Sequence, residues 1–205
     1  MPERRDHENP PQGFLLIISG PSGVGKSTLT NALLERLDAD LSVSMTTRPM
    51  SSKDVDGEHY HFVDVPKFEL AIINQQLLEH AVYNGNYYGT PRKFVQQKLD
   101  AGRVVILEID VEGARQIKSV MPDSYAIFIK APGEEALLGR LRGRQREDEE
   151  TIQKRYSLAK KEIAFAESSD VYDAFVINDD FDRAVAEIEK LVTRRLEAGH
   201  EPTLF

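Results

Sequence analysis

The amino-acid sequence predicts an α/β fold in which a doubly wound parallel sheet is flanked by helices, and three observations support this prediction. An apolar run at residues 14–18 leads through a glycine-rich turn into a helix-forming stretch. Residues 104–109 are almost wholly apolar, as expected for a strand covered on both faces of a parallel sheet. Strand-like and helix-like segments alternate along most of the chain, which indicates strands joined by helical crossovers. In such sheets, ligands bind at the carboxyl ends of the strands.

The first strand is predicted at residues 14–19, and its helix at 26–37. After it the alternation stops, and short β-type pieces separated by Asp-Gly and Asn-Gly turn signals occur at residues 42–46, 59–63 and 81–83. A helix at 65–74 lies among them, with Pro66 at an early position that helices tolerate. We therefore interpret residues 42–90 as an inserted β-rich subdomain.

The alternation resumes after residue 90. Further strands are predicted at 104–109, 125–129 and 175–178, and further helices at 91–101, 112–120, 134–142, 149–167 and 181–196. Gly102 and Pro122 end two of these helices. The last helix places apolar side chains on one face, namely Ala184, Ile188, Leu191 and Val192. The charged segment 134–157 contains no strand, which suits a mobile lid. The remaining segments 14–41, 91–133 and 158–198 then form the core.

Composition excludes several classes of protein. The chain has 205 residues, no cysteine and a formal net charge of −8, which rules out disulfides and argues against nucleic acid as a partner. Its longest apolar runs are far shorter than the ~20 residues that cross a bilayer, so we expect no membrane association. Residues 1–13 are polar and proline-rich and predict a disordered leader, and 199–205 form a tail. We expect a cytoplasmic protein that is a monomer or a small homo-oligomer.

The most informative motif is GPSGVGKS at residues 20–27, hereafter the phosphate loop, because it stands between a buried strand and a helix. Its glycines let backbone N–H groups wrap a phosphate, and the helix directs its positive dipole end at the same anion. Lys26 supplies a point charge for the outer phosphates, and the Ser27 hydroxyl suits a magnesium ion. The predicted ATP-binding residues here are Gly20, Pro21, Ser22, Gly23, Val24, Gly25, Lys26, Ser27 and Thr28.

A second feature separates kinases from other proteins with such a loop. Regulatory GTPases read guanine with an Asn/Thr-Lys-x-Asp motif, which this sequence lacks. Positive charge is concentrated instead in one short window that holds Arg140, Arg142, Arg144 and Arg146. A solvated helix face would explain such a cluster equally well. Together with the inserted subdomain, however, arginines on a lid suit a nucleotide kinase, which must align two anions and exclude water.

Six short segments, in this order, resemble the guanylate kinase family: VSMTTR (43–48), DGEHYHFV (56–63), EHAVYNGNYYGT (79–90), LEIDVEGA (107–114), RLRGR (140–144) and VINDD (176–180). The similarity runs from about residue 14 to residue 196. It implies a P-loop kinase core, an inserted subdomain that binds GMP, and a helical lid. The implied reaction is Mg²⁺-dependent transfer of the γ-phosphoryl group of ATP to GMP, with dGMP also accepted. This reaction belongs to purine nucleotide metabolism and recycles GMP.

The resemblance implies a site for the base and phosphate of GMP. Glu79 matches the acid that accepts hydrogen bonds from the guanine N1–H and 2-amino groups, a pair of donors that adenine lacks. Ser44 and Thr90 match hydroxyl residues that contact the base. The phosphate-binding residues are Arg48, Tyr60 and Tyr88. Tyr87 we expect in the core of a hairpin.

The resemblance also implies roles around the triphosphate. Glu108 and Asp110 would hold the water shell of magnesium and contact GMP, although capping of the following turn is an alternative, more so for Glu108. Arg140, Arg144 and Arg155 match arginines that contact the ATP phosphates and the migrating phosphoryl group. Arg142 and Arg146 we expect in solvent. Asn178 and Asp179 match a loop beside the adenine.

The sequence departs from the family at one phosphate-binding position. The family has a Thr-Arg-x-x-Arg arrangement, and Ser51 stands where the second arginine is expected. Lys53 is a possible substitute, but an ammonium lacks the planar fork of a guanidinium. We therefore expect weaker binding of the GMP phosphate.

Two other functions are compatible with these residues. A related kinase could use another phosphorylated acceptor, such as a ribose bisphosphate, although Glu79 together with Ser44 favours guanine. Guanylate-kinase-like domains of scaffold proteins bind protein partners without catalysis, but those generally have damaged phosphate loops, and this loop is intact.

Overall fold

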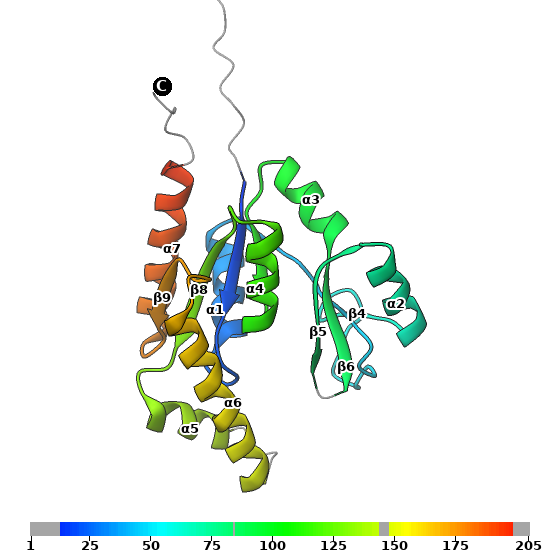
Figure 1. Ribbon diagram of the computed structural model, residues 1–205. Coiled ribbons are helices and arrows are strands. Elements are labelled where there is room, and N and C mark those ends of the chain that lie inside the picture. Colours follow the sequence, from blue (N-terminus) through cyan, green and yellow to red (C-terminus); the bar gives the residue numbers. More distant parts are fainter. Residues whose placement is uncertain (1–12, 84, 144–147, 199–205) are drawn as a thin grey trace, which may run out of the picture.

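The structure is a computed structural model that describes residues 13–83, 85–143 and 148–198, and it confirms the predicted α/β fold (Figure 1). The central sheet has five parallel strands in the order β2-β7-β1-β8-β9. The strands are β1 (Leu15–Ser19), β2 (Asp40–Leu41), β7 (Val105–Glu108), β8 (Tyr125–Lys130) and β9 (Ala174–Ile177). The predicted tail and all of the predicted leader except Gly13 lie outside the described residues.

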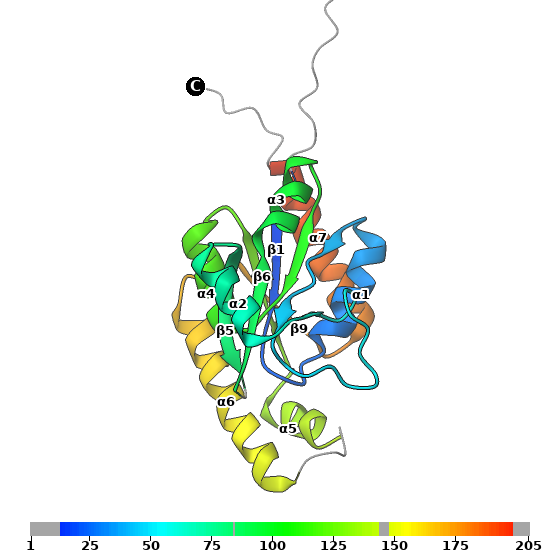
Figure 2. The same cartoon turned by 90° about the vertical axis from the view of Figure 1, so that its right-hand side faces the viewer.

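Both faces of this sheet are buried, which explains the uninterrupted apolar run of β1. Leu15 and Ile17 pack in a cluster with residues of α3 (Arg92–Asp100), α4 (Val111–Val120) and α6 (Glu149–Ser168). Leu16 and Ile18 pack on the other face, against α1 (Lys26–Arg36) and α7 (Phe181–Ala198). Figure 2 shows α1 and α7 on one side of β1 and α4 and α6 on the other.

The inserted subdomain has a mixed sheet of its own, in the order β4-β3-β6-β5. Its elements are β3 (Met45–Thr46), β4 (His61–Phe62), α2 (Val65–Ile73), β5 (Leu77–Tyr83) and β6 (Asn86–Pro91). Phe68 and Ala71 of α2 pack with Leu77, and Tyr87 stacks on Phe68 with ring centroids 5.2 Å apart. The expectation that Tyr87 is a core aromatic is therefore confirmed.

Several predicted strands in this region were wrong in extent. The segment predicted as one strand at 42–46 holds only Met45–Thr46, and Asp40–Leu41 before it joins the core sheet. The strand predicted at 81–83 begins at Leu77, and β6 was not predicted at all. Glycine and proline weaken the strand signal of β6, but its antiparallel pairing with β3 and β5 compensates. The other predicted elements from 59–63 onward and in the core differ from the observed ones by at most two residues at either end.

The predicted lid consists of α5 (Glu134–Arg142) and the start of α6. These helices pack through Leu137, Leu141, Ile152 and Ala159. The predicted lid boundary at residue 157 falls inside α6, which continues without a break to Ser168 on the core. None of the helices in the described part of the chain has the length and apolar character needed to cross a membrane.

Candidate active site

The phosphate loop leaves the carboxyl end of β1 and enters α1, as predicted. Gly25, the residue before the helix, has φ 101°, and a Cβ there would lie 2.6 Å from the Asn178 amide nitrogen. Gly20 has φ 147°, and a Cβ there would lie 2.5 Å from the Ile129 carbonyl oxygen. Both positions therefore require glycine, for conformation and for space. The N-terminus of an eleven-residue helix faces this turn, which favours an anion.

The lysine and serine of the motif project from this turn. Lys26 Nζ donates hydrogen bonds to the carbonyl oxygens of Gly20, at 2.6 Å, and Pro21, at 3.1 Å. The ammonium group thus lies against the backbone at the start of the loop. Ser27 Oγ donates to Glu108 Oε1 at 2.6 Å, which joins the first turn of α1 to the carboxyl end of β7. Thr28 follows on the exposed side of the same turn.

Two of the predicted arginines reach the phosphate loop from the helices. Arg140 of α5 donates to the Val24 carbonyl oxygen at 3.2 Å and to the Asn178 carbonyl oxygen at 2.7 Å. Arg155 of α6 contacts the Ser22 hydroxyl. Arg144 and Arg146, which were also singled out, lie outside the described residues. Arg142 points away and pairs with Glu149 at an exposed position, as expected.

Asn178 and Asp179, which are predicted to lie beside the adenine, follow β9 and differ in their surroundings. Asn178 is buried, and its side-chain amide donates to the Val24 carbonyl oxygen at 2.8 Å. This residue therefore holds the phosphate loop from behind. Asp179 is exposed and accepts hydrogen bonds from the Asp180 N–H and from Arg183 at the start of α7.

One acidic residue near the loop was missed by the sequence analysis. Glu162 lies on α6 two helical turns after Arg155, hence on the same face. Burial raises its pKa to about 7, while the nearby Lys26 lowers the pKa and Asp110 raises it further. These influences place Glu162 among the charges of the site. The seven-residue spacing from Arg155 was the signal that could have identified it.

The predicted base-reading acid, Glu79, is buried in β5. Its Oε1 accepts a hydrogen bond of 2.6 Å from the Thr90 hydroxyl across the hairpin. Burial raises the pKa of Glu79 to about 7, Thr90 opposes that rise, and the negative charge of Asp110 adds to it. Thr90 thus fixes the acid, a role that the sequence analysis did not assign. Ser44, half-buried just before β3, accepts the His61 N–H through its carbonyl oxygen at 2.9 Å.

The two acids at the carboxyl end of β7 differ in their contacts, and helix capping falls on the residue for which it was the weaker alternative. Asp110 is the N-cap of α4 and accepts the Gly113 N–H at 2.8 Å, so the capping role falls on this residue. Glu108, for which capping was the stronger alternative, contacts Ser27 of the phosphate loop instead. The reason is register: the last residue of β7 faces the loop beside it, and only the residue two places later adjoins the helix.

The predicted phosphate-binding residues of the insert gather around Arg48. Its guanidinium carbon lies 5.4 Å from the centroid of the Tyr60 ring and 5.3 Å from that of Phe62. Tyr60 and Tyr88 are edge-to-face, with ring centroids 5.7 Å apart. The pKa of Tyr60 is raised, first by burial and then by Tyr88, so its hydroxyl stays a neutral donor.

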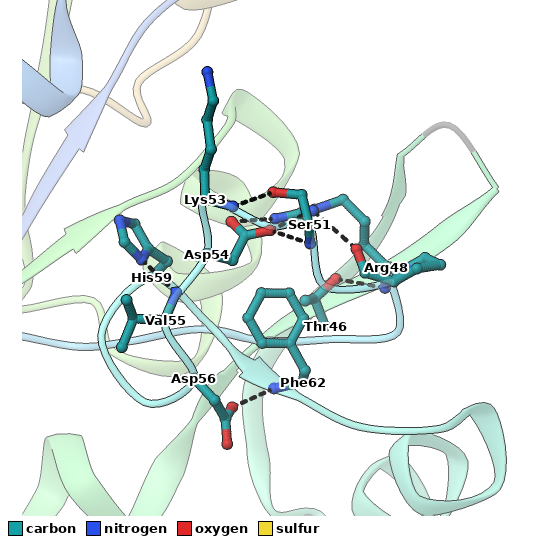
Figure 3. A network of polar contacts seen from close by, with 10 residues as sticks. Thr46, Arg48, Ser51, Lys53, Asp54, Val55, Asp56, His59 and Phe62 are labelled. Carbon is teal, nitrogen blue, oxygen red and sulfur yellow. Dashed lines mark hydrogen bonds and ion pairs between the residues drawn. The ribbon is translucent and has the colours of Figure 1, made fainter.

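An unpredicted carboxylate completes this group. Asp54 accepts two hydrogen bonds of 3.0 Å from the Arg48 guanidinium, one at each oxygen, and one of 2.6 Å from the Ser51 N–H (Figure 3). Arg48 is the main reason that the pKa of Asp54 lies well below its usual range. Lys53, considered as a substitute for the second arginine, points away from Arg48 in this arrangement.

Comparisons with known proteins agree on one family. The family model described as guanylate kinase matches residues 12–195. The chain is 46% identical over 183 residues to a guanylate kinase of Nostoc sp., covering 89% of this chain and 90% of that protein. It is 46% identical over 202 residues to a guanylate kinase of Chromohalobacter salexigens, covering 95% and 93%. The crystal structure of a guanylate kinase from Anaplasma phagocytophilum superposes with a TM-score of 0.73 at 31% identity, over 94% of this chain and 89% of that one.

Proposed function

The chain belongs to the guanylate kinase family, and we propose that it transfers the γ-phosphoryl group of ATP to GMP at the site formed by the phosphate loop, the inserted subdomain and α5–α6. The observation that carries the proposal is that one short segment, residues 108–113, contacts both the phosphate loop and Glu79. Glu108, at one end of that segment, contacts Ser27. Gly113, five residues later, is so close to Glu79 that a Cβ would lie 3.1 Å from its Oε2.

Glu79 reads the base. As a carboxylate it accepts the guanine N1–H and 2-amino hydrogen atoms, while Thr90 holds one of its oxygens in place. Adenine offers no such pair of donors, so AMP would leave a buried acid unsatisfied. Ser44 supplies a further hydroxyl on the same subdomain. Burial of Glu79 supports this role because a recognition acid away from water discriminates most strongly.

Arg48, Tyr60 and Tyr88 bind the GMP phosphate. The guanidinium supplies planar donors to its oxygens, and the two phenols add neutral donors without further charge. Two aromatic rings beside Arg48 support this role because they restrict the plane of the guanidinium.

Magnesium fits between the phosphate loop and the carboxyl end of β7. Ser27 and Glu108 offer oxygen ligands 2.6 Å apart, the kind that this ion prefers, and nucleotide kinases hold it through few protein groups plus substrate phosphates. Among the described residues there is no cluster of three or more His, Cys, Asp or Glu for a metal held by protein alone. Bound magnesium would neutralise charge on the transferring phosphoryl group. Asp110 would contribute through the water around it.

The transfer itself needs no covalent enzyme intermediate. An oxygen of the GMP phosphate forms the new bond to the γ-phosphorus while the bond from that phosphorus to the β–γ bridging oxygen breaks, which yields GDP and ADP. Lys26, Arg140 and Arg155 stabilise the charge that develops, and we assign Arg144 to the same task. The contacts of Lys26, Arg140 and Arg155 with the phosphate loop support the roles of these three residues, because catalysis here rests on alignment and charge.

A coupled assay with ATP and a panel of acceptors tests the proposal. We expect ADP release with GMP and dGMP, and rates near background with AMP, UMP or no acceptor. Turnover of AMP or UMP at a comparable rate would contradict the role of Glu79. A scaffold domain would release no ADP with any acceptor. A kinase for a ribose bisphosphate would respond to that compound alone.

A further inference from the structure

The Arg48 guanidinium is held by Asp54 along one defined edge. Nη1 donates to Asp54 Oδ2 and Nη2 to Asp54 Oδ1, each at 3.0 Å, so the carboxylate occupies the end of the planar group. The other Nη1 hydrogen is directed at the Pro49 carbonyl oxygen, 3.0 Å away. Three of the five guanidinium N–H groups are thus used within the loop.

The two N–H groups that remain lie on one side of the guanidinium. They are Nε–H and the second Nη2–H, and together they form a lateral fork that can take two oxygens of a phosphate. Neither has a partner in the part of the chain that the structure describes. The pKa of Arg48 is raised, chiefly by its hydrogen bond to Asp54, so the guanidinium keeps all five of its N–H donors.

Asp54 is in turn anchored by the loop itself. It accepts the Ser51 N–H at 2.6 Å, and its side chain is only 12% exposed. Ser51 thus contributes its backbone N–H to holding Asp54 at the place where the family resemblance expects a second arginine. A carboxylate fixed in this way is a support for Arg48 rather than a ligand that exchanges with substrate.

We propose that Asp54 is a positioning residue for phosphate recognition: it holds the end of the Arg48 guanidinium so that the lateral fork, Nε–H and Nη2–H, presents to the GMP phosphate. This inference rests on the proposed function of Arg48. The ion pair is neutral as a whole, so it adds orientation without adding attraction for every anion. Aromatic rings beside the guanidinium fix its plane, and Asp54 fixes its rotation within that plane.

The test is Asp54→Asn, compared with a matched control in the same loop. Asp56→Asn removes the same charge from a residue whose side chain accepts the Phe62 N–H and does not contact Arg48 (Figure 3). In Asp54→Asn we expect KM for GMP to rise about tenfold, because an amide cannot accept both guanidinium bonds. Asp54→Glu should recover part of this loss. In Asp56→Asn, KM for GMP should stay within about twofold of the parent.

Inhibition by guanosine separates positioning from general damage. Guanosine uses the base site but has no phosphate, so its inhibition constant should be the same in Asp54→Asn and the parent. An unchanged KM for GMP in Asp54→Asn would overturn the proposal. A lower KM would overturn it too, because Asp54 would then compete with the GMP phosphate for Arg48. Equal weakening of GMP and guanosine would overturn it as well. Failure of the parent protein to phosphorylate GMP would instead refute the proposed function.

Discussion

The two regions that we propose to bind phosphate are built in different ways. The phosphate loop presents backbone N–H groups, and glycines 20 and 25 fix its shape from within a run of eight residues. The Arg48 region uses side chains, and they come from separate segments that only the fold of the insert brings together. A site made of backbone N–H groups is therefore specified by adjacent residues. A site made of side chains depends in addition on residues such as Asp54, which holds the binding side chain in place.

This difference predicts how each region tolerates change. In the phosphate loop a single substitution should cause a severe loss of activity, because no other side chain of the loop supplies the positive charge of Lys26. In the insert, several neighbouring side chains share the binding of one substrate, so each substitution should be graded in effect. Substitutions should therefore rank from a severe loss of activity in the phosphate loop to smaller losses in the insert.

Lys26→Ala should lower kcat by about 1,000-fold or more, because it removes the mobile positive charge at the outer phosphates. KM for GMP should change little, since the insert is untouched. The coupled assay measures both, and thermal unfolding should show an intact fold. Lys190→Ala, an exposed lysine on α7, serves as the control. Near-normal turnover in Lys26→Ala would contradict the assignment of this residue.

Glu79→Gln should lower kcat/KM for GMP by about 100-fold, because an amide in place of the carboxylate brings a donor to face the donors of guanine. The loss should fall on GMP alone, with no gain for UMP. This result would show that the base acid, which is buried, is the least replaceable side chain of the insert. A loss below about threefold would remove Glu79 from base recognition.

The same variant isolates a pH effect. The pKa of Glu79 is raised to about 7, so the acid is mostly protonated at pH 6 and mostly ionised at pH 8. Only the ionised form accepts both guanine hydrogens, hence KM for GMP should fall about tenfold across this range in the parent. Ionisation of GMP itself affects parent and Glu79→Gln alike. The extra pH dependence should therefore vanish in the variant, and its persistence would contradict the role of Glu79.

Gly113→Ala should raise KM for GMP several-fold. A Cβ at this position would lie 3.1 Å from Glu79 Oε2 and 3.3 Å from the Ile109 Cβ, so the acid has to shift by a few tenths of an ångström. Stability should not fall in step, because alanine is better than glycine inside α4 by up to about 1 kcal/mol. Gly139→Ala, where a Cβ meets nothing within 4 Å, is the control for helix propensity. An unchanged KM for GMP would show that Glu79 has room to move.

The sequence predicted the phosphate loop, which adjacent residues specify, far better than the region around Arg48. The phosphate loop, its lysine and serine, and the alternating core followed from adjacent residues and from burial on two faces of a sheet. The β6 strand was missed because its pairing with β3 and β5, not its composition, makes it a strand. Asp54 was missed because an acid near a phosphate site has no chemical signature until the fold places it on Arg48. That Asp110 rather than Glu108 caps α4 depended on strand register, which the sequence left open.

Ser51→Arg is the smallest change expected and the one most specific to this chain. It restores the family's second arginine beside a phosphate site, which should lower KM for GMP about fivefold, the effect of one partly exposed charged hydrogen bond. The Ser51 N–H that holds Asp54 belongs to the backbone and is kept in the variant. The inhibition constant of guanosine should not change, since the gain concerns the phosphate alone.

The outcome of Ser51→Arg also bears on how side-chain sites differ from the phosphate loop. A new guanidinium at position 51 has two choices, the GMP phosphate or the carboxylate of Asp54, which already faces this residue. If KM for GMP falls, Asp54 remains paired with Arg48 and the new guanidinium binds the phosphate. A site made of side chains would then have gained a phosphate-binding group by one substitution, which a loop of backbone N–H groups could not do. If KM does not fall, the expectation that Ser51 weakens phosphate binding is wrong. Lys53→Ala in both backgrounds then shows whether that exposed lysine already fills the role.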